Sequence, residues 1–303
     1  MSARARWLAR APLGDAGAVR SWVNPARPGY PYPEIAGLWL RFAARQGAPP
    51  SAVDPVRERL REDGASGLVG RAGLSYAFDT AAALGGLVAT GGAGVVERRM
   101  FDAVVDAVER RRAVREGTDV DRWSTRWTGH MLKMIAPLRR YAEATGDARA
   151  EGAARRLLDD LHARGGVEPF DGGDFYTHAF CYAAEGLLAA HAWGLGDFAR
   201  DLGVHAAALA SMQRDDGTLP AFRSGGPSRA DATAQAVRLW CAVDRERHGE
   251  AIAKALGALA SLDAGEGGLR YEPGSGDVNT WATLFALQAE AWAAGAVDVG
   301  DLW

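Results

Sequence analysis

The chain has 303 residues, of which 48% are hydrophobic and 24% are charged, a composition typical of a folded globular protein. The formal net charge is −3. This balance excludes the basic surface that a nucleic-acid-binding domain needs. The length exceeds that of one ordinary core, but repeat toroids and barrels of this size form single domains.

The first residues, Met1 to Arg10, are basic but lack the apolar core of a signal peptide. No apolar run reaches the roughly 18 residues of a transmembrane helix, so membrane insertion is not expected. Cys181 and Cys241 lie in helical patterns without metal-ligand spacing, and we interpret them as buried free thiols. Reduced thiols favour a cytoplasmic location. We expect residues 1–24 to form an N-terminal extension or first outer helix, and residues 25–303 to form one domain.

One pattern recurs along the chain: a loop rich in Gly and Pro, a polar or aromatic cluster, and then an apolar helix of small residues. The six clusters, in chain order, lie at 28–37, 70–80, 121–130, 165–178, 216–233 and 267–281. Their anchor residues are 45, 48, 51, 53 and 48 residues apart by subtraction: Glu34, Asp79, Trp127, His178, Asp231 and Asn279.

The helices between the clusters alternate in character. Residues 81–88, 183–190 and 282–289 are apolar and small, as in helices packed on all sides. Residues 100–110 and 153–162 are amphipathic, with apolar positions at i, i+3, i+4 and i+7. Strand signals are weak, and the extended segment 268–271 fits a loop. Six helix-pair repeats of about 50 residues predict an all-α protein, an (α/α)6 toroid.

In such a toroid all six clusters reach the same mouth, where a pocket is expected. Aromatic side chains beside charged and amide groups suit stacking against sugar rings. The alternatives are loop packing, helix capping by Asp231 and Asn279, and ion pairing by the arginines. The candidate substrate-binding residues are Tyr32, Tyr76, Arg126, Trp127, Tyr176, Arg229, Asp231, Asn279 and Trp281.

Two kinds of catalytic group occur in the clusters. Glu34 and Asp79 could flank a glycosidic bond as general acid and as base or nucleophile. His130 and His178 occupy corresponding places in adjacent repeats and could exchange a proton at a sugar carbon. Helix capping by Asp79 and buried hydrogen bonding by the histidines are the structural alternatives. Two histidines without a third ligand do not make a metal site, so we expect neither a metal nor another cofactor.

The segment from Gln213 to Gly217 resembles the Q-x-x-x-G turn of triterpene cyclases and prenyltransferases, in which the glutamine braces helix ends. We interpret this segment as structural. The chain lacks the acidic motifs of those enzymes.

Taken together, the six clusters resemble a family of bacterial α/α-toroid proteins associated with polysaccharide biosynthesis. The similarity spans residues 25 to 295 and includes Tyr32 to Gly37, Phe78 to Thr80, Ser124 to Arg126 and Thr177 to Tyr182. It implies the fold and a polysaccharide setting. A looser similarity, at residues 129–134 and 142–147, is to N-acylglucosamine 2-epimerases, whose histidine chemistry would fall on His130 and His178.

Three functions are therefore expected to compete. The first is a carbohydrate-directed enzyme, a glycoside hydrolase or lyase or a sugar epimerase, acting on a small-molecule or oligosaccharide substrate. The second is a terpene-cyclase-like or other tailoring enzyme that uses the toroid cavity. The third is a non-catalytic glycan-binding toroid. The fold alone does not choose between them, and the oligomeric state stays open.

Overall fold

In a computed structural model, the described residues are 1–71, 73–114, 123–161 and 174–302. The chain is mostly helical and divides into two compact units. The 30–166 unit holds residues 13–21 and the described part of 30–166. The 167–302 unit holds residues 1–12, 22–29 and the described part of 167–302. Residues 72, 121–122 and 165–173 of the predicted clusters lie outside the described residues.

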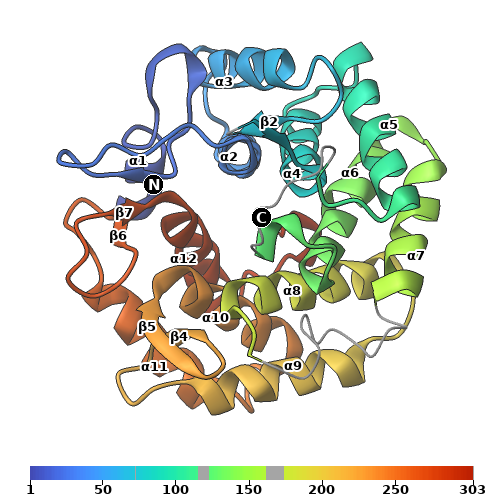
Figure 1. Ribbon diagram of the computed structural model, residues 1–303. Coiled ribbons are helices and arrows are strands. Elements are labelled where there is room, and N and C mark those ends of the chain that lie inside the picture. Colours follow the sequence, from blue (N-terminus) through green and yellow to red (C-terminus); the bar gives the residue numbers. More distant parts are fainter. Residues whose placement is uncertain (72, 115–122, 162–173, 303) are drawn as a thin grey trace. The chain divides into compact units, whose positions relative to one another are not determined.

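In its described residues, the 30–166 unit has two largely buried helices, α2 (Pro33–Arg45) and α4 (Ala77–Ala89), with α6 (Ile135–Thr145) packed against α4 and three further helices around them (Figure 1). Its other elements are η1 (Asp15–Gly17), α3 (Pro50–Asp63), β2 (Gly70–Arg71), β3 (Leu74–Ser75), α5 (Val95–Arg110), η2 (Trp123–Thr125), η3 (Gly129–Met134) and α7 (Arg149–Leu161). Helix α4 packs between α2 and α6, and α3, α5 and α7 cover them.

Glycines bring α2 and α4 unusually close. A Cβ at Gly37 would stand 2.2 Å from the carbonyl oxygen of Ala82, and one at Gly86 would stand 2.3 Å from that of Gly37. Because only a residue without a side chain fits there, the small-residue texture of these segments is a packing requirement.

The 167–302 unit repeats the plan with α8 (Thr177–Trp193), α10 (Ala230–Asp244) and α12 (Thr280–Ala293) as its buried helices. The remaining elements are α1 (Ala3–Leu8), β1 (Trp22–Val23), α9 (Ala199–Met212), β4 (Leu219–Phe222), β5 (Gly225–Arg229), α11 (Gly249–Ser261), β6 (Leu269–Arg270), β7 (Val278–Asn279) and η4 (Val299–Asp301). Helices α9 and α11 pack on α10, and α1 packs on α12. The domain boundary at residue 24 stays a prediction.

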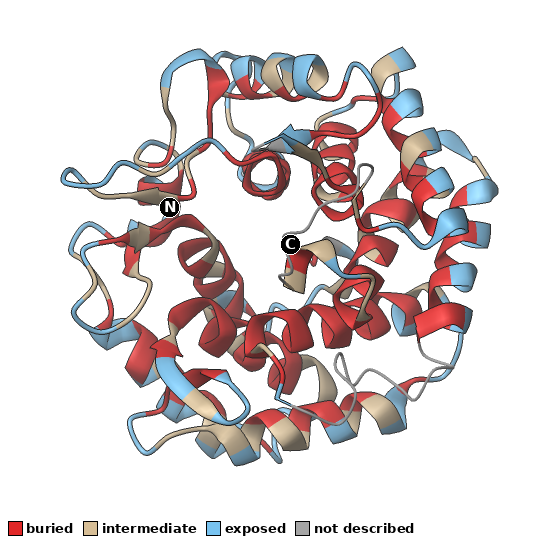
Figure 2. Ribbon diagram, viewed as in Figure 1, coloured by how far each residue is buried: buried red, intermediate tan, exposed pale blue. Residues whose placement is uncertain are grey.

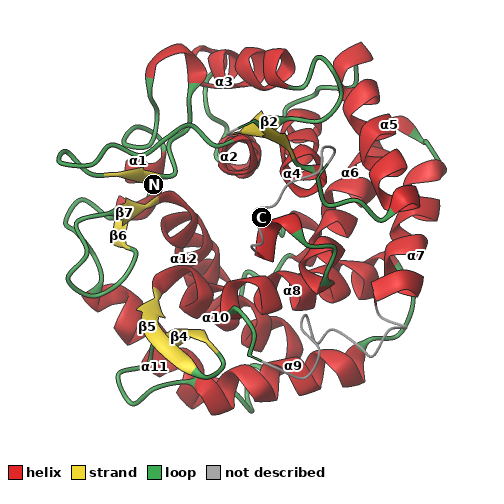
Figure 3. Ribbon diagram, in the orientation of Figure 1, coloured by secondary structure: helices red, strands yellow, loops and turns green. Residues whose placement is uncertain are grey.

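Short strands hold the loops that lead into the buried helices (Figure 3). Strands β4 and β5 form an antiparallel hairpin before α10. Strand β7 pairs with both β1 and β6 before α12. The sequence showed weak strand signals and predicted a loop over residues 268–271, where the structure has β6. Runs of two to five residues are too short to show a strand period.

A threonine in the first turn of three buried helices ties helix to loop. Thr80, Thr233 and Thr283 each lie four residues after the residue that precedes the helix, and each donates to that residue's carbonyl oxygen at 2.6 to 2.7 Å. The same hydroxyls accept from the backbone N–H of Val69, Leu219 and Leu269 at 2.9 to 3.0 Å. The start of each helix is therefore fixed against its own loop.

The buried faces follow the predicted alternation (Figure 2). In α8 every residue from Thr177 to Ala190 is buried, whereas α9 buries only four residues, Leu202, His205, Ala206 and Leu209. Cys181 and Cys241 are free and buried. The side chain of Gln213 donates to the carbonyl oxygens of Gly217 at 3.1 Å and Ala251 at 2.9 Å, which is the bracing role predicted for it. In the part of the chain that the structure describes, no helix is long and apolar enough to cross a membrane.

Candidate functional site

The predicted site residues are divided between the two units. Tyr32, Glu34, Tyr76, Asp79, Arg126, Trp127 and His130 belong to the 30–166 unit, and Tyr176, His178, Arg229, Asp231, Asn279 and Trp281 belong to the 167–302 unit. In the second group, His178 and Asp231 form the pair around which the candidate site is arranged.

His178 and Asp231 are each the second residue of a buried helix, α8 and α10 respectively. Because these neighbouring helices pack together, residues at the same position meet: Nδ1 of His178 lies 3.1 Å from Oδ2 of Asp231. Both side chains are less than a tenth exposed. Oδ1 of Asp231 accepts from the backbone N–H of Ala232 at 2.8 Å, in the first turn of α10, which fixes the carboxylate.

Two tyrosines place their hydroxyl groups beside this pair. Tyr176 precedes α8, Tyr271 follows β6, and their hydroxyl oxygens lie 3.0 Å apart. Burial, with the nearby charge of Asp231, raises the pKa of Tyr176 to about 12 and the pKa of Tyr271 well above its usual range. Both phenols therefore remain neutral donors at physiological pH.

A partly buried cation completes the group. Arg229, the last residue of β5, pairs with Glu272 and lies over the ring of Tyr271 with its Cζ 4.6 Å from the ring centroid. Ring stacking and an ion pair together hold the guanidinium plane. We call the six residues Tyr176, His178, Arg229, Asp231, Tyr271 and Glu272 the His178 site.

A second polar row lies beneath this site. Glu185, Arg238 and Gln288 each stand nine residues after the residue that precedes their helix, on α8, α10 and α12. Arg238 pairs with Glu185 and donates to Gln288 at 2.7 Å. Its Cζ lies 4.2 Å from the ring centroid of Phe285, which in turn stacks with His178 at 6.3 Å.

In the 30–166 unit, Glu34 is the second residue of α2 and Asp79 the third of α4, and both are buried. His130 is the second residue of η3 and fully buried. Its Nδ1 lies 2.8 Å from Oγ1 of Thr128, and its ring contacts those of Phe78 and Trp123 at 5.5 and 5.1 Å. These contacts fit the buried, hydrogen-bonded alternative for this histidine.

The remaining candidates have varied surroundings. Asn279 caps α12 by accepting from the backbone N–H of Ala282 at 2.8 Å, as the capping alternative predicts. Trp127 donates to Asp160 at 2.8 Å, Tyr76 is fully buried, and Arg126 is exposed. Tyr32 is buried beside the exposed Tyr30, and Trp281 is half-buried at the start of α12.

Sequence reasoning did not select Glu272, Glu185 or Arg238. Glu272 lies in a turn whose path depends on strand pairing, and no sequence signal marks it. The other two could have been found. The residues that precede α8, α10 and α12 are spaced by 53 and 50, and so are Glu185, Arg238 and Gln288. None of the described residues form a group of three or more His, Cys, Asp or Glu that could hold a metal ion.

Comparison with solved structures shows similarity over nearly the whole chain. A glycosidase matches with a TM-score of 0.68 and 15% identity, covering 96% of this chain and 97% of that one. An unsaturated glucuronyl hydrolase specific for heparin matches with a TM-score of 0.67 and 10% identity, covering 96% and 94%. A possible member of the GH105 family from Salmonella enterica matches with a TM-score of 0.66 and 12% identity, covering 96% and 92%.

At these identities the likeness establishes the fold. The chain is an all-α protein of the α/α-toroid class, as predicted. The sequence matches no protein-family model and no curated protein. The proteins of similar fold carry glycoside hydrolase names, and nothing in these comparisons favours isomerase or cyclase-like chemistry or a role in polysaccharide biosynthesis.

Proposed function

We propose that this protein is a carbohydrate-directed enzyme, a glycoside hydrolase, and that the His178 site binds the sugar. The observation that carries the proposal is the buried pair of His178 and Asp231, 3.1 Å apart, grouped with two neutral phenols and a guanidinium. A titratable pair beside several fixed hydrogen-bond donors is the combination that acid–base catalysis on a polyhydroxylated substrate needs.

His178 is proposed as the proton-transfer group. Nδ1 lies 3.1 Å from Oδ2 of Asp231, and a proton held at Nδ1 would leave Nε2 to take or give a proton at the substrate. Asp231 then orients the ring and stabilises its protonated form, as a carboxylate does beside a catalytic imidazole.

Tyr176, Tyr271 and Arg229 are proposed to hold the sugar. The phenols can donate to ring or hydroxyl oxygens, and Arg229 can exchange Glu272 for a carboxylate on the substrate. Two proteins of similar fold are named unsaturated glucuronyl hydrolases, so uronic sugars are the first substrates to test.

Glu34 and Asp79, both in the 30–166 unit, are the alternative catalytic carboxylates, because hydrolysis of a glycosidic bond commonly uses two. Epimerisation by histidine acid–base chemistry is the competing reaction. The products separate the two reactions: hydrolysis releases a sugar and its leaving group, whereas epimerisation leaves one sugar with an inverted carbon.

The test is hydrolysis of a panel of aryl glycosides and unsaturated uronic disaccharides by the purified protein. Asp231→Asn and His178→Gln should each lower kcat/KM by about 100-fold to 10,000-fold, the usual contribution of acid–base catalysis. Asp277→Asn is the matched control, because Asp277 is also buried but bonds Asn24 and Arg27 instead. Full activity of Asp231→Asn, with a loss in Glu34→Gln or Asp79→Asn, would move the chemistry away from the His178 site.

A further inference from the structure

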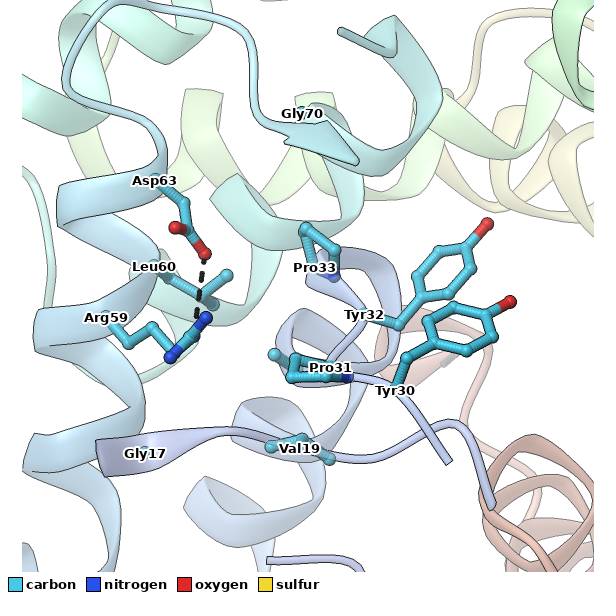
Figure 4. A pocket seen from close by; sticks show the side chains of 11 residues that line it. Gly17, Val19, Tyr30, Pro31, Tyr32, Pro33, Arg59, Leu60, Asp63 and Gly70 are labelled. Atoms are coloured by element: carbon cyan, nitrogen blue, oxygen red, sulfur yellow. Dashed lines mark ion pairs between the residues drawn. The ribbon is translucent and has the colours of Figure 1, made fainter. Parts of the chain in front are cut away.

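A cavity of about 530 Å³ lies within the 30–166 unit and is lined by none of the residues of the His178 site. One wall is the C-terminal half of α3, with Arg59, Leu60 and Asp63. The opposite wall is the segment 30–33, where Pro31 and Pro33 face α3 and the side chains of Tyr30 and Tyr32 extend together away from it (Figure 4). Its size is that of a small-molecule pocket.

The charged side chains of this cavity are balanced. Nε of Arg59 lies 3.8 Å from Oδ2 of Asp63, a long separation that leaves hydrogen-bonding edges on both groups. Burial raises the pKa of Asp63, against the lowering effect of Arg59. A charged ligand would be attracted by one of these groups and repelled by the other. An uncharged ligand with several hydroxyl groups can bond both without disturbing the balance.

The rest of the lining is mostly apolar. Its exposed surface comes from Pro31 and Tyr30, whereas Val19 and Leu60 are each only 1% exposed, and Gly17 and Gly70 add backbone without a side chain. A Cβ at Gly17 would stand 2.0 Å from the carbonyl oxygen of Pro55, so the loop is packed firmly against α3. An apolar wall facing a carboxylate and a guanidinium matches a pyranose ring, which has a C–H face and a rim of hydroxyls.

We infer that this cavity is a second sugar-binding site, which takes a neutral pyranose unit and is lined by residues other than those of the His178 site. The ligand class rests on the proposed function, whereas the cavity and its charge balance do not.

The test measures binding, not turnover, on the full chain. Methyl glucopyranoside and methyl glucuronopyranoside are titrated by calorimetry and by saturation-transfer NMR into the wild type, two double variants and Arg229→Ala. Arg59→Ala/Asp63→Ala removes the cavity pair. Arg57→Ala/Asp54→Ala removes the neighbouring ion pair of α3, which does not line the cavity. A melting curve of each variant verifies that it is folded.

The neutral glycoside should bind the wild type and the Arg57→Ala/Asp54→Ala variant equally. It should bind the Arg59→Ala/Asp63→Ala variant at least about tenfold more weakly, because this variant removes two charged groups and the loss of one hydrogen bond to a charged group already costs about tenfold. Three results would overturn the inference: no binding to the wild type, tighter binding of the uronate than of the neutral glycoside at this cavity, or binding that survives Arg59→Ala/Asp63→Ala but is lost in Arg229→Ala. The proposed function is tested by the turnover of Asp231→Asn, whereas the second sugar site is tested by binding. One proposal can therefore fail while the other holds.

Discussion

Removal of Arg238 should destabilise the fold more than any exposed arginine does. Its guanidinium is 0% exposed, and its partner Glu185 is 1% exposed. Burial lowers the pKa of Arg238, whereas the charge of Glu185 raises it. The ion pair with Glu185 therefore offsets part of the cost of burying this cation. Arg238→Met fills similar volume but leaves the Glu185 carboxylate without its cation.

Loss of one partner of a buried pair costs about 3–5 kcal/mol. For 303 residues, an unfolding entropy of about 2.1 cal/mol/K per residue gives about 0.6 kcal/mol/K in total. Arg238→Met should therefore lower Tm by roughly 5–8 °C.

The assay is urea unfolding and calorimetry of Arg238→Met, Glu185→Leu and the double variant. The double variant should regain much of the lost stability, because it removes both charges from the interior. Arg155→Met is the matched control, since its pair with Glu151 is about half exposed and exposed pairs contribute about 0.3–0.5 kcal/mol. A fall in Arg238→Met no larger than in this control, with single effects that simply add, would refute the reasoning.

Three further changes test the packing, the capping and the buried phenol. Gly37→Ala should cost about 1–3 kcal/mol, because its Cβ would meet Ala82 on α4. Gly152→Ala, in open space on α7, should instead gain up to about 1 kcal/mol, and urea unfolding measures both. Asn279→Ala should lose about 1 kcal/mol with the cap of α12, and a loss of sugar binding at unchanged stability would contradict this role. Because the pKa of Tyr176 is raised to about 12, the native state keeps a proton that the unfolded chain loses, so stability should fall as pH rises from about 10 to 12. Urea titrations across this range should give a shallower fall for Tyr176→Phe.

The sequence was most informative where the repeat puts corresponding residues at the same height along neighbouring helices. The alternation of apolar and amphipathic helices predicted the α/α-toroid class. An apolar helix must be surrounded by other helices, and an amphipathic helix must pack its apolar face against them. The same repeats placed Glu34 and Asp231 at helix starts and made His178 an anchor of its cluster. In the structure all three are the second residues of their helices. The contact between His178 and Asp231 then follows, because the two residues hold the same position on two helices that pack side by side.

Predictions failed where the register had to be exact to one residue. The chosen anchors mixed the second residue of α10 with the residue before α12, so the spacing of 48 between them hid the true spacing of 50. The correct reference residues are those that precede the helices: Tyr176, Arg229 and Asn279. Nine residues after each of them stands one member of the second polar row: Glu185, Arg238 and Gln288. Short strands and turns, such as the one that holds Glu272, depend on long-range pairing and leave no local signal.

The contact between the second polar row and the His178 site also affects how activity measurements must be interpreted. Arg238 lies over Phe285, and Phe285 stacks with His178, so a change at Arg238 can shift the ring of His178 through one aromatic side chain. Lost activity in Arg238→Met would therefore not make Arg238 catalytic. Asp231→Asn is cleaner, because it keeps the shape of the side chain and removes one charge beside His178. If Asp231→Asn loses activity with its melting temperature unchanged while Asp277→Asn keeps activity, the loss belongs to the His178 pair and not to a buried carboxylate in general.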